Sequence, residues 1–202
     1  SRIAALLVIR PGLPVNSMRE LLVELKKNPG KFTYASAGNG TTSHLAGETL
    51  KAQAGISAVH IPYRGGAAAI TDVLADRIDF MIDVMPNTAP HVRSGRLKGL
   101  AVSTLQRVAG LPDVPTIAES GVPGFDVTAW DALFAPAGTP SAVIEKLGQA
   151  VNKVLADEFL RQQLLSRGTE VSPTTPAGLR TFVQAEVERW GQAIKRSGTT
   201  ID

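Results

Sequence analysis

The sequence predicts an α/β fold with a largely parallel sheet. Short apolar runs alternate with segments of helical period through the first half of the chain, and turns rich in glycine and proline separate them. Strands joined through helices of this length indicate β-α-β units and hence parallel strands. With 202 residues, 44% of them hydrophobic, the chain is long enough for one large domain or two small ones.

The first half is expected to alternate strands and helices in a regular order. Ser17 and Glu20 form a capping box that opens a helix, and Pro29-Gly30 ends it. The periodicity of the apolar residues predicts further helices at 42–54, 66–74 and 86–94, and strands at 4–9, 32–35, 58–61, 78–83 and 97–103.

The second half changes character after residue 103. Residues 106–126 predict loops, and 126–135 has the pattern of a strand. Two helices are expected to begin at Thr139-Pro140 and Thr175-Pro176, because Thr is a good N-cap and Pro fits the first helical position. We therefore expect one complete α/β lobe at 10–103, with 1–9 and 104–202 belonging to another, incomplete lobe.

Composition excludes several classes of protein. The chain has no cysteine, which removes disulfides and thiolate sites, and no apolar run approaches the ~20 residues of a membrane span. The net charge is +3, and the basic residues are scattered, whereas nucleic-acid binding needs a clustered basic face. A small acidic ligand fits this charge better. The start at Ser1, without an initiator Met, indicates a processed, truncated or engineered N-terminus.

The most informative segment is residues 36–43, which we call the cradle. It follows a short apolar run, opens a helix, and contains Gly38 and Gly40 among hydroxyl and amide side chains. Glycine lets the backbone approach a ligand closely, and a helix start offers unpaired N–H groups that favour an anion. Neither G-x-x-x-x-G-K-S/T nor G-x-G-x-x-G is matched, so no nucleotide fingerprint is present. A tight turn without a ligand is the alternative interpretation.

Turns at 36–43, 62–66 and 83–87 follow successive predicted strands. The carboxyl ends of parallel strands meet at one edge of a sheet, where ligands bind. Tyr63, Asp83 and Asn87 are therefore expected around one crevice with the cradle. Asp83 would repel an acidic ligand directly, but it could cap the next helix or accept from a ligand amine or a bridging water.

Catalysis is the minority interpretation. His44, in the first turn of a helix, is expected to be neutral, and His60 and His91 are expected to be structural or at the surface. No histidine spacing fits a metal. Ser36 or Ser43 could be drawn with His44 and Asp83 as a triad, but no G-x-S-x-G elbow supports it. We expect no catalytic residue, no metal and no cofactor.

The chain resembles a known family through four ordered motifs. These are the segments 34–45 (YASAGNGTTSHL), 60–66 (HIPYRGG), 111–125 (LPDVPTIAESGVPGF) and 135–140 (APAGTP). They look like the Bug-type solute-binding proteins, the receptors of tripartite tricarboxylate transporters, and the resemblance runs from about Ala4 to Asp202. It implies a periplasmic, two-lobed Venus-flytrap receptor that captures a small carboxylate or amino-acid-like ligand for membrane transporter subunits, and not an enzyme.

The resemblance also implies which residues face the ligand. Segment 10–103 looks like the family's second lobe, Asp83 matches an acidic position at the cleft edge, and Trp130 is a candidate cleft wall. Packing of Trp130 under the final helices is equally expected. The cradle residues that match the ligand-facing stretch are Ser36, Gly38, Asn39, Gly40, Thr41, Thr42 and Ser43.

One departure from the family pattern lies at the front of the chain. The Pro-Pro-Gly-Gly type loop of family members is missing, which implies a truncated form whose incomplete first lobe could self-associate. The alternatives are a ligand-sensing or interaction module without a transport role, and a small-anion, hydrolase-like enzyme.

Overall fold

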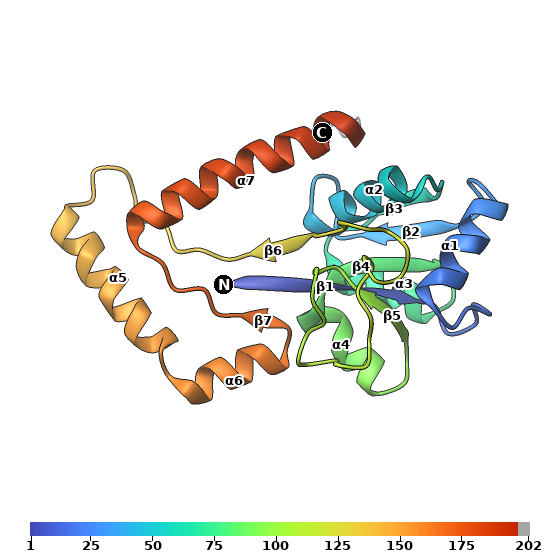
Figure 1. The fold of residues 1–202 in the computed structure, drawn as a ribbon, viewed down its shortest axis with the longest axis horizontal. Coiled ribbons are helices and arrows are strands. Elements are labelled where there is room, and N and C mark those ends of the chain that lie inside the picture. Colours follow the sequence, from blue (N-terminus) through green and yellow to red (C-terminus); the bar gives the residue numbers. More distant parts are fainter. Residues whose placement is uncertain (198–202) are drawn as a thin grey trace.

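A mixed sheet in the order β3-β2-β4-β1-β5 forms the centre of the molecule (Figure 1). The computed structural model describes residues 1–197. The strands are β1 (Arg2–Ile9), β2 (Thr33–Ser36), β3 (Val59–Pro62), β4 (Phe80–Val84) and β5 (Lys98–Val102). β2 runs parallel to β3 and β4, whereas β1 runs antiparallel to β4 and β5. The α/β class is confirmed; β2, β3, β4 and β5 run in one direction, and the sheet is mixed because β1, between β4 and β5, runs the opposite way.

Helices cover both faces of this sheet. α1 (Met18–Lys27) and α2 (Thr42–Ala54) pack on one face, and α3 (Gly66–Leu74) and α4 (Met85–Arg93) on the other. β1 supplies alternate residues to the two core layers, with Leu7 and Ile9 on one side and Leu6 and Val8 on the other. A strand buried on both faces reads as a continuous apolar run, which explains the sequence of β1.

The helices α1 and α2 begin where the sequence predicts them to begin. Ser17 Oγ accepts from the Glu20 amide at 3.2 Å, and the Glu20 carboxylate accepts from the Asn16 amide at 2.8 Å. α2 begins at Thr42 and ends at Gly55, which has the left-handed conformation (φ 62°). Such caps depend on residues a few positions apart, so the sequence alone can reveal them.

The C-terminal part is built around the first residues of β1. Arg2–Ala4 pair antiparallel with β6 (Thr128–Trp130) and Arg2–Ile3 with β7 (Thr169–Glu170). The helices here are α5 (Ser141–Leu155), α6 (Glu158–Ser166) and α7 (Pro176–Ser197). In Figure 1, α5 stands away from the α/β lobe, whereas the end of α6 reaches α4, where Arg93 donates to the Ser166 carbonyl. α7 runs back over β6 toward α2, which it contacts. The strand expected over 126–135 is only three residues long, because β1 extends only that far for pairing.

Residues outside the expected segment 10–103 also contribute to the central sheet and its core, while the division into two lobes stays a prediction. The second half of β1, expected in the other lobe, lies inside the central sheet, where Ala5–Ile9 pair with β4. Ile117, Phe125 and Val127 lie beyond residue 103 but belong to the core under α1 and α2. Strand pairing and apolar burial, rather than position along the chain, therefore place residues 1–9 and 104–127.

Of the two expected Thr-Pro helix starts, only one has the expected cap. The Gly178 amide donates to Thr175 Oγ1 at 3.0 Å at the start of α7. Thr139 instead donates to the Pro136 carbonyl at 2.8 Å, and α5 begins two residues later without a side-chain cap. None of the helices within residues 1–197 is long and apolar enough to cross a bilayer.

Candidate functional site

A cleft of about 290 Å³ lies between the start of α2, strand β6 and helix α7. It is at the carboxyl end of β2, the edge of the sheet at which the three turns were expected to meet. Its lining residues come from three separate parts of the chain and are Gly40, Thr42, Leu45, Thr128, Ala129, Trp130, Trp190 and Ile194. Predicted site residues from the cradle and from β6 are therefore brought together in one cleft.

The backbone of the cradle is shaped by its glycines. Gly38 has φ 130° and Gly40 has φ 73°, conformations that side chains disfavour. Thr41 Oγ1 donates to the Gly38 carbonyl at 2.7 Å and closes the loop before α2 begins. The first amides of any α-helix have no carbonyl acceptor within the helix, and in α2 these are the amides from Thr42 onward. The cradle thus presents N–H groups and the positive end of a helix dipole beside the cleft.

The predicted cradle residues divide into two sets by burial. Ser36 and Ser43 are buried, and the Ser43 hydroxyl accepts from the Ala37 amide at 2.8 Å. These two serines hold the shape of the loop and do not line the cleft. The partly or fully exposed set, which remains available to a ligand, is Gly38, Asn39, Gly40, Thr41 and Thr42.

Two stacked histidines lie behind the cradle. The rings of His44 and His60 are nearly parallel, at 5°, with centroids 3.9 Å apart. The Gly40 amide donates to His44 Nδ1 at 3.1 Å, and His60 Nε2 lies 2.6 Å from Ser36 Oγ. Burial is the largest cause that lowers the pKa of His44. Burial is also the largest cause for His60, whose pKa is lowered to about 4. The lowered pKa of His44 favours the expected neutral imidazole, and its largest cause is burial rather than the position of His44 at a helix start.

The catalytic triad that could be drawn from the sequence does not form. Ser36 contacts His60 rather than His44, and the Asp83 carboxylate bonds to Asn87. Within residues 1–197 no carboxylate hydrogen-bonds to His60, and its lowered pKa makes it a weak general base. Ser36 is fully buried. Ser43, the other serine of that possible triad, is buried too.

Asp83 and Tyr63 lie beside the cradle but do not line the cleft. Asn87 donates to the Asp83 carboxylate at 2.9 Å, and burial raises the pKa of Asp83. A Cβ atom on Gly66 would lie 2.6 Å from this carboxylate, so Asp83 sits against the start of α3. The Tyr63 hydroxyl donates to Asp72 at 2.7 Å, while its amide donates to the Ser36 carbonyl at 3.0 Å. The main chain of Tyr63, rather than its ring, supports the cradle.

Trp130 both lines the cleft and packs against α7, while its contact with a ligand stays a prediction. It lines the cleft, and its ring packs edge-on against Phe182 at 5.5 Å. Its indole donates to the Glu186 carboxylate at 3.1 Å, and Trp190 donates to the same oxygen at 3.0 Å. Glu186 is buried and thus fixes both indoles as a wall opposite the cradle. The sequence analysis did not predict this role of Trp190 and Glu186. A charged residue at position 186, among the apolar residues of α7, was the feature of the sequence that could have indicated it.

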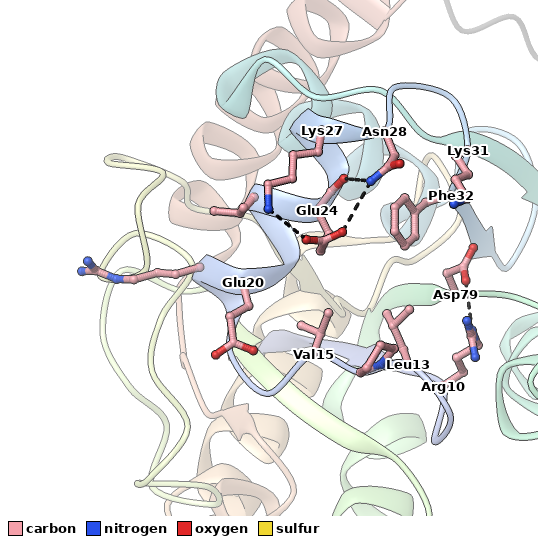
Figure 2. A pocket seen from close by; sticks show the side chains of 13 residues that line it. Arg10, Leu13, Val15, Glu20, Glu24, Lys27, Asn28, Lys31, Phe32 and Asp79 are labelled. Atoms are coloured by element: carbon pink, nitrogen blue, oxygen red, sulfur yellow. Dashed lines mark hydrogen bonds and ion pairs between the residues drawn. The ribbon is translucent and has the colours of Figure 1, made fainter.

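A larger hollow of about 770 Å³ lies at the opposite end of the sheet, beside α1. Figure 2 shows Lys27 and Asn28 both pointing at Glu24, and Arg10 pointing at Asp79. Arg10 follows β1 and Asp79 precedes β4, so this hollow lies at the edge of the sheet away from the cradle. Because Arg10 and Lys27 are already paired with carboxylates, they are less available to an anionic ligand.

Comparison with known proteins gives a consistent family. The family model described as tripartite tricarboxylate transporter family receptor matches residues 1–199. A UPF0065 protein from the tcbD–tcbE intergenic region of a Pseudomonas species is 38% identical over 191 residues, which cover 94% of this chain and 57% of that protein. The chain therefore spans little more than half the length of this relative.

Solved structures share the fold. An R. palustris protein with adipate has a TM-score of 0.94 at 32% identity, over 99% of this chain and 67% of that chain. The periplasmic binding protein BugD gives 0.88 at 37%, over 98% and 67%. MatC from Rhodopseudomonas palustris with bound malate gives 0.85 at 30%, over 96% and 67%. The expected periplasmic-binding-protein-like fold is confirmed.

Proposed function

Because the chain belongs to the tripartite tricarboxylate transporter receptor family, we propose that it binds a small carboxylate and serves transporter subunits from the periplasm. The ligand would occupy the cleft between the cradle and the two tryptophans. The observation that carries this proposal is that Gly40 and Thr42, at the start of α2, line the same cleft as Trp130 and Trp190.

The cleft offers suitable chemistry for a carboxylate with an apolar body. Residues 35–50 contain no Lys or Arg, so the cradle would bind the carboxylate through main-chain N–H groups and hydroxyls. Hydrogen bonds to a charged group contribute roughly 1.5–3 kcal/mol each. Trp130 and Trp190 would cover the methylene groups of the ligand. Relatives solved with adipate and with malate support a dicarboxylate as the first class to test.

Asp83 suits a supporting role in this proposal. Its raised pKa favours the neutral carboxyl more than at an exposed site, which reduces its repulsion of an anionic ligand. Asp83 would accept a hydrogen bond from a bridging water or from an amine of the ligand. It would thereby distinguish between ligands that carry the same carboxylate but differ in their other polar groups. An Asp83→Asn variant should therefore change the preference between malate and aspartate more than it changes the affinity for adipate.

The test is calorimetric titration of adipate and malate into the chain and two variants. Gly40 has φ 73°, so Gly40→Val would distort the cradle, and we expect at least a tenfold loss of affinity. Arg64 is exposed on the next turn, and Arg64→Ala serves as the matched control, with a change below threefold. Circular dichroism checks that both variants fold. An equal loss in both, or a larger loss for Arg64→Ala, would refute binding through the main chain.

The absolute affinity tests a second part of the proposal. About one third of each solved relative's chain lies outside the part that this sequence spans. We propose that this third supplies the opposite jaw, since small-molecule sites usually bury about 70–90% of the ligand surface. Loss of two or three charged hydrogen bonds would weaken a micromolar site to about millimolar. A fusion that adds the corresponding third of the adipate-bound relative should restore tight binding. Micromolar binding by residues 1–202 alone would contradict the two-jaw account.

A further inference from the structure

We propose that His44 and His60 act as positioning residues that hold the cradle in its binding shape only while both imidazoles are neutral. Ligand affinity would then fall on acidification. This inference rests on the proposed function, because it concerns the regulation of the same cleft. Neither histidine lines that cleft, so both act through the loop that does.

The bond between Gly40 and His44 carries the inference. The Gly40 amide donates to His44 Nδ1 at 3.1 Å, so this nitrogen must present a lone pair. A proton on Nδ1 would turn the acceptor into a donor that faces another donor. Gly40 would then lose its anchor, and Gly40 is the glycine that lines the cleft. Protonation of His44 would thus change the backbone of the cradle at Gly40, where it faces the ligand.

The stacking of the two rings restricts their charge further. With centroids 3.9 Å apart and planes within 5°, two imidazolium cations would repel each other face to face. His60 Nε2 also lies 2.6 Å from Ser36 Oγ, and that hydroxyl accepts from the Gly38 amide at 3.1 Å. The pair therefore supports both glycines of the cradle, one through each histidine.

The charged groups around the pair do not offset two added protons. From α2, Glu48 lies 4.0 Å from His44 Nε2, but its carboxylate already accepts from Lys51 at 2.7 Å. From β2, the Tyr34 hydroxyl donates to the same Glu48 oxygen at 2.5 Å. Lys51 disfavours a proton on either histidine, whereas Glu48 favours one. Burial outweighs both of these charges and lowers the pKa of each histidine.

The first experiment follows the histidines in the free protein by NMR between pH 7.5 and 4.5. The imidazole signals report protonation, and the amide signal of Gly40 reports the loop. We expect the Gly40 amide to shift with the same midpoint as His44, below the ordinary histidine pKa of about 6.5. A Gly40 amide that stays unchanged while His44 titrates would overturn the inference.

The second experiment measures adipate affinity at pH 7.5 and 5.0 for the chain, for His44→Asn and for His91→Asn. Asn can offer its side-chain oxygen near the position of Nδ1 but does not titrate, so His44→Asn should bind at both pH values. His91 lies on α4 outside the cleft and its loop, and its variant is the matched control. We expect the loss of adipate affinity on acidification to be at least threefold larger for the chain and for the His91→Asn control than for His44→Asn.

The outcomes separate this inference from the proposed function. Adipate itself takes up protons in this range, and because all three proteins meet the same ligand, only the difference between them reports on His44. An equal loss in all three would overturn the inference and leave the receptor function intact. Failure of the extended fusion to bind adipate and malate at pH 7.5 would contradict the proposed function, whereas co-titration of the Gly40 amide with His44 in the free protein would still test this inference.

Discussion

The α/β lobe and the helices α5 and α6 both carry many apolar residues, but these are buried in the lobe and exposed on the two helices. In the lobe, Leu6, Leu7, Val8 and Ile9 of β1 have no exposed surface, because helices cover both faces of the sheet. In α5 and α6 no residue is buried, although α5 carries a clear apolar stripe. An amphipathic pattern therefore shows which face of a helix is apolar, but a partner surface decides whether that face is buried.

The largest contrast is expected from leucines in the two regions. Leu7 is fully buried, and Leu7→Ala should lower the free energy of unfolding by about 2–5 kcal/mol. Leu147, on α5, is 53% exposed, and Leu147→Ala should change it by less than about 0.5 kcal/mol. Urea unfolding of both variants measures the difference. Losses of similar size would show that α5 is buried against something in solution.

Glycines within the helices of the two regions allow a second comparison, in which the expected changes in the free energy of unfolding are smaller. A Cβ atom on Gly47 of α2 would lie 2.3 Å from the Tyr34 ring, so Gly47→Ala should cost about 1–3 kcal/mol. Gly148 of α5 has open space around it, and Gly148→Ala should stabilise the helix by up to about 1 kcal/mol. Opposite signs in thermal unfolding are the expected result. A stabilising Gly47→Ala would mean that Tyr34 can move away from α2.

Acid should destabilise the lobe through the same histidines. The pKa of His60 is about 4 in the folded protein, below its ordinary value of about 6.5, so the folded state binds fewer protons between these values. The contribution of neutral His60 to the free energy of unfolding is fully present above about pH 6.5, and it is lost as the pH falls toward 4. Allowing for the partial exposure of His60, we expect a loss of roughly 1–2 kcal/mol from pH 7 to pH 5.

Variants at His60 and Asp83 test the sign of this dependence. His60→Asn should flatten the fall in stability measured by urea unfolding at pH 7 and pH 5. The pKa of Asp83 is raised, so the folded state takes up a proton there and opposes the loss. Asp83→Asn should therefore make the fall steeper. Unchanged stability between pH 7 and pH 5 in the parent chain would contradict the neutral, buried histidine pair.

The smallest effect on unfolding is expected from the exposed stripe of α5, which should instead control association. Leu147 and Val154 are 53% and 58% exposed, and apolar surface of this kind normally forms interfaces. Light scattering should show a mass that rises with concentration, and Leu147→Glu with Val154→Glu should abolish the rise. Val23→Glu, on α1, is the control that should leave it unchanged. A 21.3 kDa monomer at every concentration would refute self-association.

The sequence by itself fixed those features that depend on neighbours within a few residues. The cap of α1 at Ser17, the start of α2 at Thr42 and the cradle glycines follow from local hydrogen bonds and backbone sterics. The ordered motifs were also sufficient to identify the receptor family, which the family match confirmed. Gly40, Thr42 and Trp130 were predicted as ligand-facing residues, and all three line the cleft, although contact with a ligand stays a prediction.

Only the tertiary structure decided which distant residues meet. The direction of β1, the stacking of His44 on His60 and the bond from Trp130 to Glu186 each join segments that local signals cannot connect. Ser36 could be drawn with His44 in a triad, but proximity in sequence does not fix geometry, and Ser36 bonds to His60 because β2 and β3 pair in parallel register at this level. Strand register and helix packing are set by the burial of the whole apolar core, so they determine contacts that no short segment of sequence specifies.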